Sequence, residues 1–316
     1  MELRRGRDRI LDLKAVFDDA TKAEYYFKPM SEDQFRGRVN NKNILDDGII
    51  YCVENDEVIG YGMGYVSDIT GHIDSIVVKK AFQNKGVGSL ILKELENYFK
   101  QNGAKKIRVT SYYTWLIPGY EMHDHPNSPG IRYNSNQYFF FLRNGYNVIG
   151  HQDAFHLELK NYEMSDSIQN ILEENKKDGY VIELYDAKRH KGFEEFYQAI
   201  QNPGFEHSIR YNLGLENPRP FLVVSDKENN VLGWTGAIWN EESGRGHFDG
   251  ITISPEIRGR GLGKALFSML AYESKKNGAS FMTFYTGLTN HARYIYLGAG
   301  FNIAQSFAMM EKVLVK

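Results

Sequence analysis

The apolar positions of the chain form two similar series of short strands and longer helices. Ile49 to Glu54 and Val58 to Tyr65 are mostly apolar stretches of strand length that flank a polar turn. Phe221 to Ser225 and Val231 to Ile238 repeat this arrangement later in the chain. Short apolar runs bounded by turn residues are typical of strands. Each pair is therefore predicted to be a β-hairpin.

A third strand, a glycine-rich turn and a helix are predicted after each hairpin. The strands are Ile73 to Val78 and Phe248 to Ile253. Apolar residues then recur at the spacing of one helical face; they are Val87, Leu90, Ile91, Leu95 and Tyr98 in the first series and Leu262, Ala265, Leu266, Met269 and Leu270 in the second. An Asn-Gly pair ends each helix, because glycine adopts the left-handed conformation of a helix terminus. A further strand follows each helix, at Lys106 to Thr110 and at Phe281 to Tyr285.

The two series are copies of one another. Shifting the sequence by 175 positions aligns Gly71 to Ser111 with Gly246 to Thr286, with 11 of 41 positions identical. We therefore predict two α/β (α+β) domains, residues 1–163 and 164–316, with a helical connector at residues 165–177. Each is expected to hold a mixed, mainly antiparallel sheet flanked by helices, closed by a last strand at Phe155 to Lys160 or Phe307 to Val315.

The composition of the chain indicates which classes of binding partner and which cellular compartment to expect. The 316 residues include 38 Lys plus Arg and 40 Asp plus Glu, so the chain lacks the basic excess of most nucleic-acid-binding proteins. No apolar run reaches the roughly 18 residues of a membrane span, and the amino terminus lacks the apolar segment of a signal peptide. The single cysteine, Cys52, fits a reducing compartment. We expect a cytoplasmic protein without nucleic-acid or membrane partners.

The glycine turns are predicted to bind a phosphate or pyrophosphate. Each lies between a strand and a helix, where backbone N–H groups and the helix dipole attract anions. A nucleotide-binding P-loop requires Ser or Thr after Gly-Lys, but Ala265 follows Gly263-Lys264, and Gly88 is followed by Ser89-Leu90. The dinucleotide fingerprint G-x-G-x-x-G requires a third glycine at a spacing where neither turn has one.

Both turns match the pattern Q/R-x-x-G-x-G/A, as Gln83 to Gly88 and Arg258 to Gly263. In this they resemble the pyrophosphate-binding turn of the GNAT N-acetyltransferase superfamily, and the tandem arrangement is similar to that of mycothiol synthase and other two-copy members. The resemblance implies that acetyl-coenzyme A is the co-substrate. No metal is expected, because the two histidines of the first copy's insert, His123 and His125, are weak evidence for a metal site. The resemblance also implies contacts with the pantetheine arm or the pyrophosphate by Ile76, Val77, Val78, Asn84, Lys85, Gly86, Val87, Gly88 and Ser89, and by Ile251, Thr252, Ile253, Gly259, Arg260, Gly261, Leu262, Gly263 and Lys264.

The copies differ in the residues that the resemblance assigns to catalysis. Tyr296 precedes Gly300-Phe301 as the family's general acid does, and Asn290 is assigned to the cofactor arm. The first copy has Phe141 in place of the tyrosine, and an insert of about 20 residues that either lines an acceptor site or covers the other domain. We therefore expect catalysis in the second domain, with the first as a cofactor-binding or structural copy. His247 is expected to be the general base or a hydrogen-bonded structural residue.

These assignments predict direct transfer of an acetyl group to an amine, without a covalent enzyme intermediate. The acceptor is expected to be a small-molecule amine or a peptide. Two alternatives remain: a non-catalytic protein that binds acyl-coenzyme A for regulation, and an acetyltransferase acting on protein lysines.

Overall fold

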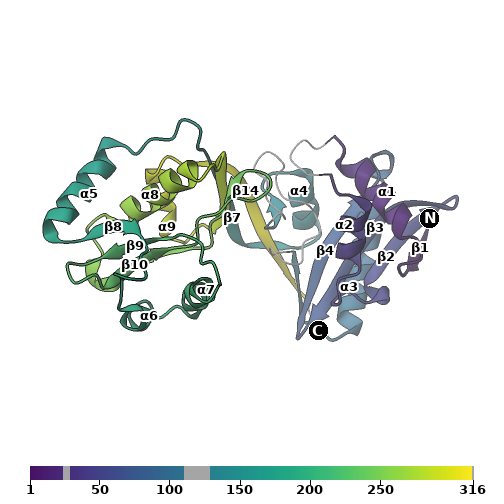
Figure 1. Ribbon diagram of the computed structural model, residues 1–316. Coiled ribbons are helices and arrows are strands. Elements are labelled where there is room, and N and C mark those ends of the chain that lie inside the picture. Colours follow the sequence, from purple (N-terminus) through teal and green to yellow (C-terminus); the bar gives the residue numbers. More distant parts are fainter. Residues whose placement is uncertain (24–28, 110–128, 315–316) are drawn as a thin grey trace. The chain divides into compact units, whose positions relative to one another are not determined.

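The computed structural model describes residues 1–23, 29–109 and 129–314 (Figure 1). The chain forms two compact units. The first unit consists of Met1–Ala154 and Gln305–Lys316, and the second of Phe155–Ala304. The expected division at residue 163 differs from this, because the predicted last strand of each copy belongs to the other unit. The insert expected to line or cover a site, residues 110–128, lies outside the described residues.

The first unit is built on a mostly antiparallel sheet with the strand order β1-β2-β3-β4-β5-β14. The β4–β5 pair is parallel, as predicted for a mixed sheet. Its elements are β1 (Glu2–Arg5), α1 (Ile10–Thr21), α2 (Glu32–Val39), β2 (Ile49–Glu54), β3 (Glu57–Ser67), β4 (Thr70–Val78), α3 (Val87–Gln101), β5 (Lys106–Val109), β6 (Ile131–Arg132) and α4 (Asn136–Arg143).

Helices cover both faces of this sheet because successive side chains of β3 point to opposite sides. Gly60, Gly62 and Gly64 lie on one face, where side chains of α3 approach their Cα atoms closely. Tyr61 lies on the other face, with its ring 6.3 Å from that of Phe35 on α2. The three glycines allow α3 to lie close to the strand that carries them.

The second unit holds two sheets. One has the order β12-β10-β9-β8, and in the other β13 lies between β11 and the end of β7. Its elements are α5 (Asp166–Asp178), β8 (Val181–Leu184), α6 (Phe193–Ile200), α7 (Pro203–Leu213), β9 (Leu222–Ser225), β10 (Val231–Thr235), β11 (Arg245–Gly246), β12 (Ile251–Ile253), α8 (Leu262–Lys276), β13 (Phe281–Gly287) and α9 (Ala292–Gly298). The predicted strand Phe248 to Ile253 is shorter in the structure, because Gly250 has φ of +148° and packs against Phe205.

The last strands, β7 (Asn147–Glu158) and β14 (Asn302–Val313), overlap the predicted strands, and each is divided between the units, after Ala154 in β7 and after Ala304 in β14. The end of β14 pairs with β5 in the first unit, with Met310 opposite Val109. In the second unit Thr283 Oγ1 of β13 donates to the carbonyl oxygen of Phe155 on β7 at 2.8 Å. An alternating pattern specifies which face of a strand is buried but not which strand lies beside it.

The predicted helices are confirmed in both copies. α3 and α8 begin directly after the glycine turns and end before Asn102-Gly103 and Asn277-Gly278, and the predicted connector is α5. Among the described residues, none of the helices has the length and apolar character needed to cross a membrane.

Candidate functional site

The two glycine turns have the same backbone conformation. Asn84 and its counterpart Gly259 have φ of +60° and +84°, and Gly86 and its counterpart Gly261 have φ of +88° and +76°. Gly86 and Gly261 are the N-cap residues of α3 and α8. The first N–H groups of a helix have no intrahelical partner and point out of its end. Each turn therefore presents backbone donors of the kind that bind an anion.

Among the described residues, the strand before each turn pairs with its parallel neighbour over a short stretch. In the first unit β4 pairs with β5 from Thr70 to His72 and then continues to Val78. In the second unit Gly246 of β11 pairs with Met282 of β13, whereas β12 pairs with β10. Gly71 lies opposite Ile107 in the first unit, which is the same register after the shift of 175. Both units thus open beside the strand that leads to the turn.

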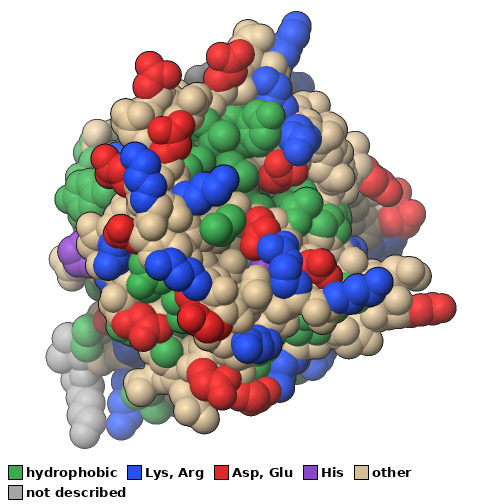
Figure 2. All heavy atoms as spheres, turned by 60° about the vertical axis from the view of Figure 1, so that its left-hand side comes forward, with side chains coloured by type: hydrophobic (Ala, Val, Ile, Leu, Met, Phe, Trp, Pro, Cys, Tyr) green, Lys and Arg blue, Asp and Glu red, His purple; other side chains and the backbone are tan. Residues whose placement is uncertain are grey.

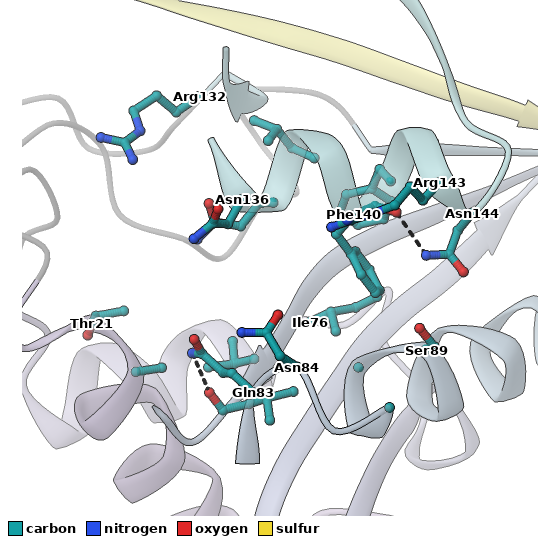
Figure 3. Close-up of a pocket in the computed structure, with 18 of the residues that line it drawn as sticks. Thr21, Ile76, Gln83, Asn84, Ser89, Arg132, Asn136, Phe140, Arg143 and Asn144 are labelled. Atoms are coloured by element: carbon teal, nitrogen blue, oxygen red, sulfur yellow. Dashed lines mark hydrogen bonds between the residues drawn. The ribbon is translucent and has the colours of Figure 1, made fainter. Parts of the chain in front are cut away.

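In the first unit this opening is a cleft of about 590 Å³ (Figure 3). Seven of the residues assigned from the sequence line it: Ile76, Val77, Val78, Asn84, Gly86, Gly88 and Ser89. Val87 is buried beneath the turn, and the Lys85 ammonium lies 5.6 Å from the ring centroid of Phe82. Gln83 Nε2 donates to the Val78 carbonyl oxygen at 2.9 Å and so ties the turn to β4.

The opposite wall of the cleft comes from α4 and β6, which the sequence did not indicate. Phe140 lies over the Cα of Gly88, and Asn144 Nδ2 donates to the Phe140 carbonyl oxygen at 2.8 Å (Figure 3). Arg132 and Arg143 are the charged side chains among the described lining residues, and these include no carboxylate. The cleft is therefore suited to an anionic ligand. The sequence did carry one indication of this wall: α4 precedes Gly145-Tyr146 in the first copy, just as α9 precedes Gly300-Phe301 in the second.

Asp74 is a buried carboxylate on β4, two residues before the first cleft-lining residue of that strand. Ser75 pairs with Met63 and Ile73 with Gly64, so Asp74 is the extra residue of a β-bulge. It is 1% exposed, and neither of its carboxylate oxygens has a hydrogen-bond partner among the described residues. Burial raises the pKa of Asp74 well above its ordinary value. In the sequence, Asp74 could have been singled out because it aligns with an identical residue, Asp249, in the second copy.

In the second unit the turn contacts other parts of the chain. The Ile171 side chain lies against the Cα of Gly261, and Arg260 pairs with Asp178 at 2.7 Å. Leu262 is buried and Gly263 lies beside Ile295, while the Lys264 stem packs against Gly298. Ile251, Thr252 and Ile253 are half-buried, and Gly259 has no described side chain near its Cα.

Tyr296 lies inside an aromatic cluster. It is 5% exposed, and the rings of Phe155, Phe248, Phe267 and Phe284 lie within 6.0 Å of its ring, measured between centroids. Burial raises the pKa of Tyr296 to about 12. A phenol in this position donates a proton less readily than an exposed one.

The two remaining sequence-assigned residues of the second unit are engaged with neighbours. The His247 ring stacks on Trp239 at 4.5 Å, with Nδ1 3.5 Å from Glu241 and Nε2 3.9 Å from Asp249. Asn290 Nδ2 donates to Thr286 Oγ1 at 3.0 Å, and Asn290 Oδ1 accepts from the backbone N–H of Ala292.

Charged side chains of both signs are interspersed over the face of the molecule shown in Figure 2.

Three solved structures share the fold over nearly the whole chain. A glucosamine N-acetyltransferase region of a fungal multi-domain GH3 β-N-acetylglucosaminidase aligns with a TM-score of 0.66 and 17% identity; it covers 98% of this chain, which spans 38% of the length of that longer protein. A GCN5-related N-acetyltransferase from Sphaerobacter thermophilus has a TM-score of 0.62 and 14% identity, with coverages of 98% and 95%. A tandem GNAT protein from the clavulanic acid biosynthesis pathway has a TM-score of 0.57 and 13% identity, with coverages of 99% and 98%. No curated protein matches the sequence.

The family model supplies the stronger assignment, because likeness at such low identity shows the fold alone. The model of the acetyltransferase (GNAT) family matches residues 13–121 and 166–301, one stretch for each copy. Together the two stretches cover well over half of the chain. The chain therefore belongs to the acetyltransferase (GNAT) family, as a tandem member with two copies.

Proposed function

We propose that the protein transfers an acetyl group from acetyl-coenzyme A to an amine in the cleft of the first unit. The observation that carries this proposal is the continuity of the 590 Å³ cleft with the glycine turn and the separated strand β4. The turn offers backbone donors for a pyrophosphate, and beside it the residues Ile76 to Val78 of β4 line the cleft. Two proteins of similar fold, a GCN5-related N-acetyltransferase and a tandem GNAT protein, are of this reaction class.

Each part of the cleft fits a part of the substrate. The N–H groups at the start of α3 would hold the pyrophosphate, and Arg143 supplies a positive charge near them on the opposite wall. The backbone of Ile76 to Val78 would hold the extended pantetheine arm. Phe140 and Phe141 form an apolar wall that would exclude water from the thioester.

Transfer requires the amine nitrogen to attack the carbonyl carbon of the thioester. The C–N bond forms and the C–S bond breaks, and the departing thiolate takes up a proton. The amine must also lose a proton, because an amine of pKa near 10 is charged at neutral pH. We assign Asp74 as its acceptor, because it lies on β4 two residues before the cleft-lining Ile76 and because burial raises the pKa of its carboxyl group above the ordinary value.

The sequence alone placed catalysis in the second copy because of Tyr296. The geometry favours the first unit, because Tyr296 is enclosed by phenylalanine rings whereas the first turn opens into a cleft. In the first unit Phe141 has no proton to donate. The thiolate, with a thiol pKa of about 8.5, would be protonated by water.

A matched pair of variants distinguishes the two units. Asn84→Asp adds a negative charge to the first turn without a change in size, and its φ of +60° is tolerated by Asp. Gly259→Asp adds the same charge at the corresponding position of the second turn, where its Cβ meets no described atom within 4 Å. A unit charge about 6 Å from a phosphate, in an effective dielectric of about 20 to 40, repels it by about 1.5–3 kcal/mol. That is about a 10- to 100-fold loss of affinity.

The assay is release of free thiol from acetyl-coenzyme A with a panel of small amines and lysine peptides. Asn84→Asp should lower kcat/KM about 10- to 100-fold, while Gly259→Asp should retain the parental value. The opposite result would place transfer in the second unit. Binding of acetyl-coenzyme A without turnover on any acceptor would instead support a regulatory protein, and turnover on peptides alone would support a protein-lysine acetyltransferase.

A further inference from the structure

The described lining of the cleft contains two arginines, Arg132 and Arg143, and they lie toward opposite ends of it. The eight residues of α4 span about 12 Å, from Asn136 to Arg143. Phe140, in the second half of this helix, lies 3.5 Å from the position of a Cβ on Gly88. The half of α4 that ends at Arg143 therefore lies beside the glycine turn, whereas Arg132 comes before the start of the helix.

Figure 3 shows the same division. Arg132, Asn136 and Thr21 lie toward one end of the cleft, and Arg143 and Ser89 lie toward the other. Ser89 belongs to the first turn of α3, so the second group marks the end beside the glycine turn. We call the end marked by Arg132, Asn136 and Thr21 the far end.

The backbone between Arg132 and Asn136 is held in place by hydrogen bonds. Arg132 lies opposite Phe307 in the pairing of β6 with β14. The carbonyl oxygen of Arg132 accepts from the backbone N–H of Ser135 at 3.3 Å, which closes a turn directly before α4. Ser135 Oγ then accepts from the backbone N–H of Tyr138 at 3.2 Å and caps the helix. The position of Arg132 at the far end is therefore set by the fold.

The proposed mode of coenzyme binding leaves the far end to the acceptor. The pyrophosphate would lie at the start of α3 and the pantetheine arm along Ile76 to Val78, so the thioester would lie at the tip of the arm, away from the turn. An amine can approach the carbonyl carbon only from the part of the cleft that the coenzyme does not fill. Asp74, the assigned base, precedes Ile76 on β4 and so also lies beyond the turn.

The charge of the far end selects among amines. Among the described lining residues it offers the guanidinium of Arg132 and the side-chain amides of Asn136 and Gln137, and these residues include no carboxylate. A second ammonium group on the acceptor, as in a polyamine or an aminoglycoside, would be repelled there. A carboxylate would be attracted, because a guanidinium binds it through two parallel hydrogen bonds. The amides can donate to its remaining lone pairs.

We infer that the acceptor is a small molecule that carries a carboxylate together with its reacting amine, as a free amino acid does, and that Arg132 binds the carboxylate. The amine nitrogen forms the new amide bond, the C–S bond breaks, and the carboxylate is unchanged in the N-acetyl product. This substrate class rests on the proposed function and deepens it. Arg132 then determines acceptor specificity, while Arg143 serves the coenzyme.

The test compares free amino acids with the amines that differ from them by the carboxylate alone: phenylalanine with phenethylamine, leucine with isopentylamine, and lysine with cadaverine. Thiol release gives kcat/KM for each acceptor, and the ratio of the amino acid to its amine is the quantity measured. Arg132→Gln should lower this ratio about 10- to 100-fold, mainly through a higher KM for the amino acid. The intrinsic reactivities of the two amines cancel when the variant is compared with the parental chain. Arg132→Glu should lower the ratio further, in favour of cadaverine.

The matched control is Arg143→Gln, which removes the same charge at the other end of the cleft. It should raise KM for acetyl-coenzyme A and leave the acceptor ratio within about twofold of the parental value. Circular dichroism establishes that each variant is folded. If Arg132→Gln does not fold, Arg132→Lys keeps the charge without the paired hydrogen bonds and should lower the ratio about three- to tenfold.

An unchanged ratio in folded Arg132→Gln would overturn the inference, and so would turnover of the amines alone by the parental chain. Weaker coenzyme A binding by Arg132→Gln in calorimetry, with the ratio unchanged, would assign this guanidinium to the coenzyme instead. If the parental chain binds coenzyme A but releases no thiol, transfer is refuted, and titration of the coenzyme-saturated chain with the same amino acids decides the inference. Binding that Arg132→Gln weakens at least tenfold would support the carboxylate site, and absence of binding would overturn it. Failure to bind coenzyme A would refute the proposed function and this substrate class together.

Discussion

Replacing Asp74 with asparagine should stabilise the first unit while abolishing transfer. The carboxylate is 1% exposed and its two oxygens have no hydrogen-bond partner among the described residues. A buried polar group without a partner costs about 1–3 kcal/mol, and more when it is charged. Asparagine keeps the shape and removes the charge. We therefore expect the free energy of unfolding to rise by about 1–3 kcal/mol at pH 8, which is a rise in Tm of about 2–10 °C for a unit of this size.

The pH dependence isolates the carboxyl group. Burial raises the pKa of Asp74 in the folded state above its unfolded value of about 3.9. Between these two values the folded state binds more protons than the unfolded state, so stability falls as the pH rises. Above the pKa that Asp74 has in the folded state, the free energy of unfolding decreases no further, because the group is then ionised in both states. The advantage of Asp74→Asn should therefore be smallest near pH 4, grow as the pH rises, and level off above the folded pKa.

Thermal melts of both proteins from pH 4 to pH 9, with turnover measured in parallel, test this reasoning. All other titrating groups are common to the two proteins, so their difference reports Asp74. A variant that is less stable at pH 8 would show that Asp74 has a partner that satisfies its charge. A variant with parental turnover would refute its assignment as the base, whatever its stability.

Three other changes test the fold and the assignment of the site. Gly64→Ala should lower the free energy of unfolding by about 1–3 kcal/mol in a denaturant titration, because its Cβ would lie 2.3 Å from the His72 carbonyl oxygen and 2.5 Å from the Phe99 ring. The control is Gly37→Ala, in α2 with open space around it, which should be neutral or stabilising by about 0.5–1 kcal/mol. Ending the chain at Ala304 should abolish coenzyme A binding in calorimetry and unfold the first unit, since it removes Phe307, Ala308 and Met310 from its core; binding retained at parental affinity would contradict this. Tyr296→Phe should leave turnover within about threefold of the parental rate if transfer occurs in the first unit, whereas a loss of about 10²-fold or more would return catalysis to the second.

The repeat carried most of the structural information that the sequence offered. Aligning Gly71 with Gly246 predicted both glycine turns, the helices that follow them and the strands that precede them. Local spacing determines such elements, because periodicity and glycine conformation act over a few residues. The division of β7 and β14 between the units was not predictable in this way. The choice of neighbouring strand depends on tertiary packing, which a local pattern does not encode.

The candidate site was predictable in its backbone but not in its accessibility. The pattern around Gly86 and Gly261 specified the same turn twice, with φ values that agree within about 12° at the N-cap. The surroundings of a turn depend on residues distant in sequence, such as Phe140, which lies over Gly88 at the first turn. The same limit applies to Tyr296, whose role was inferred from its identity, whereas its burial arises from four rings of four other segments.

The two copies therefore contribute to one cleft in different ways. Strand β14 lies between β5 and β7 and pairs with β6, with Phe307 opposite Arg132 and Ala308 opposite Ile131. Ile131 and Arg132 line the cleft, so the position of its outer wall depends on the last strand of the second copy. The first unit therefore depends on residues 305–313 both for its fold and for the outer wall of its cleft.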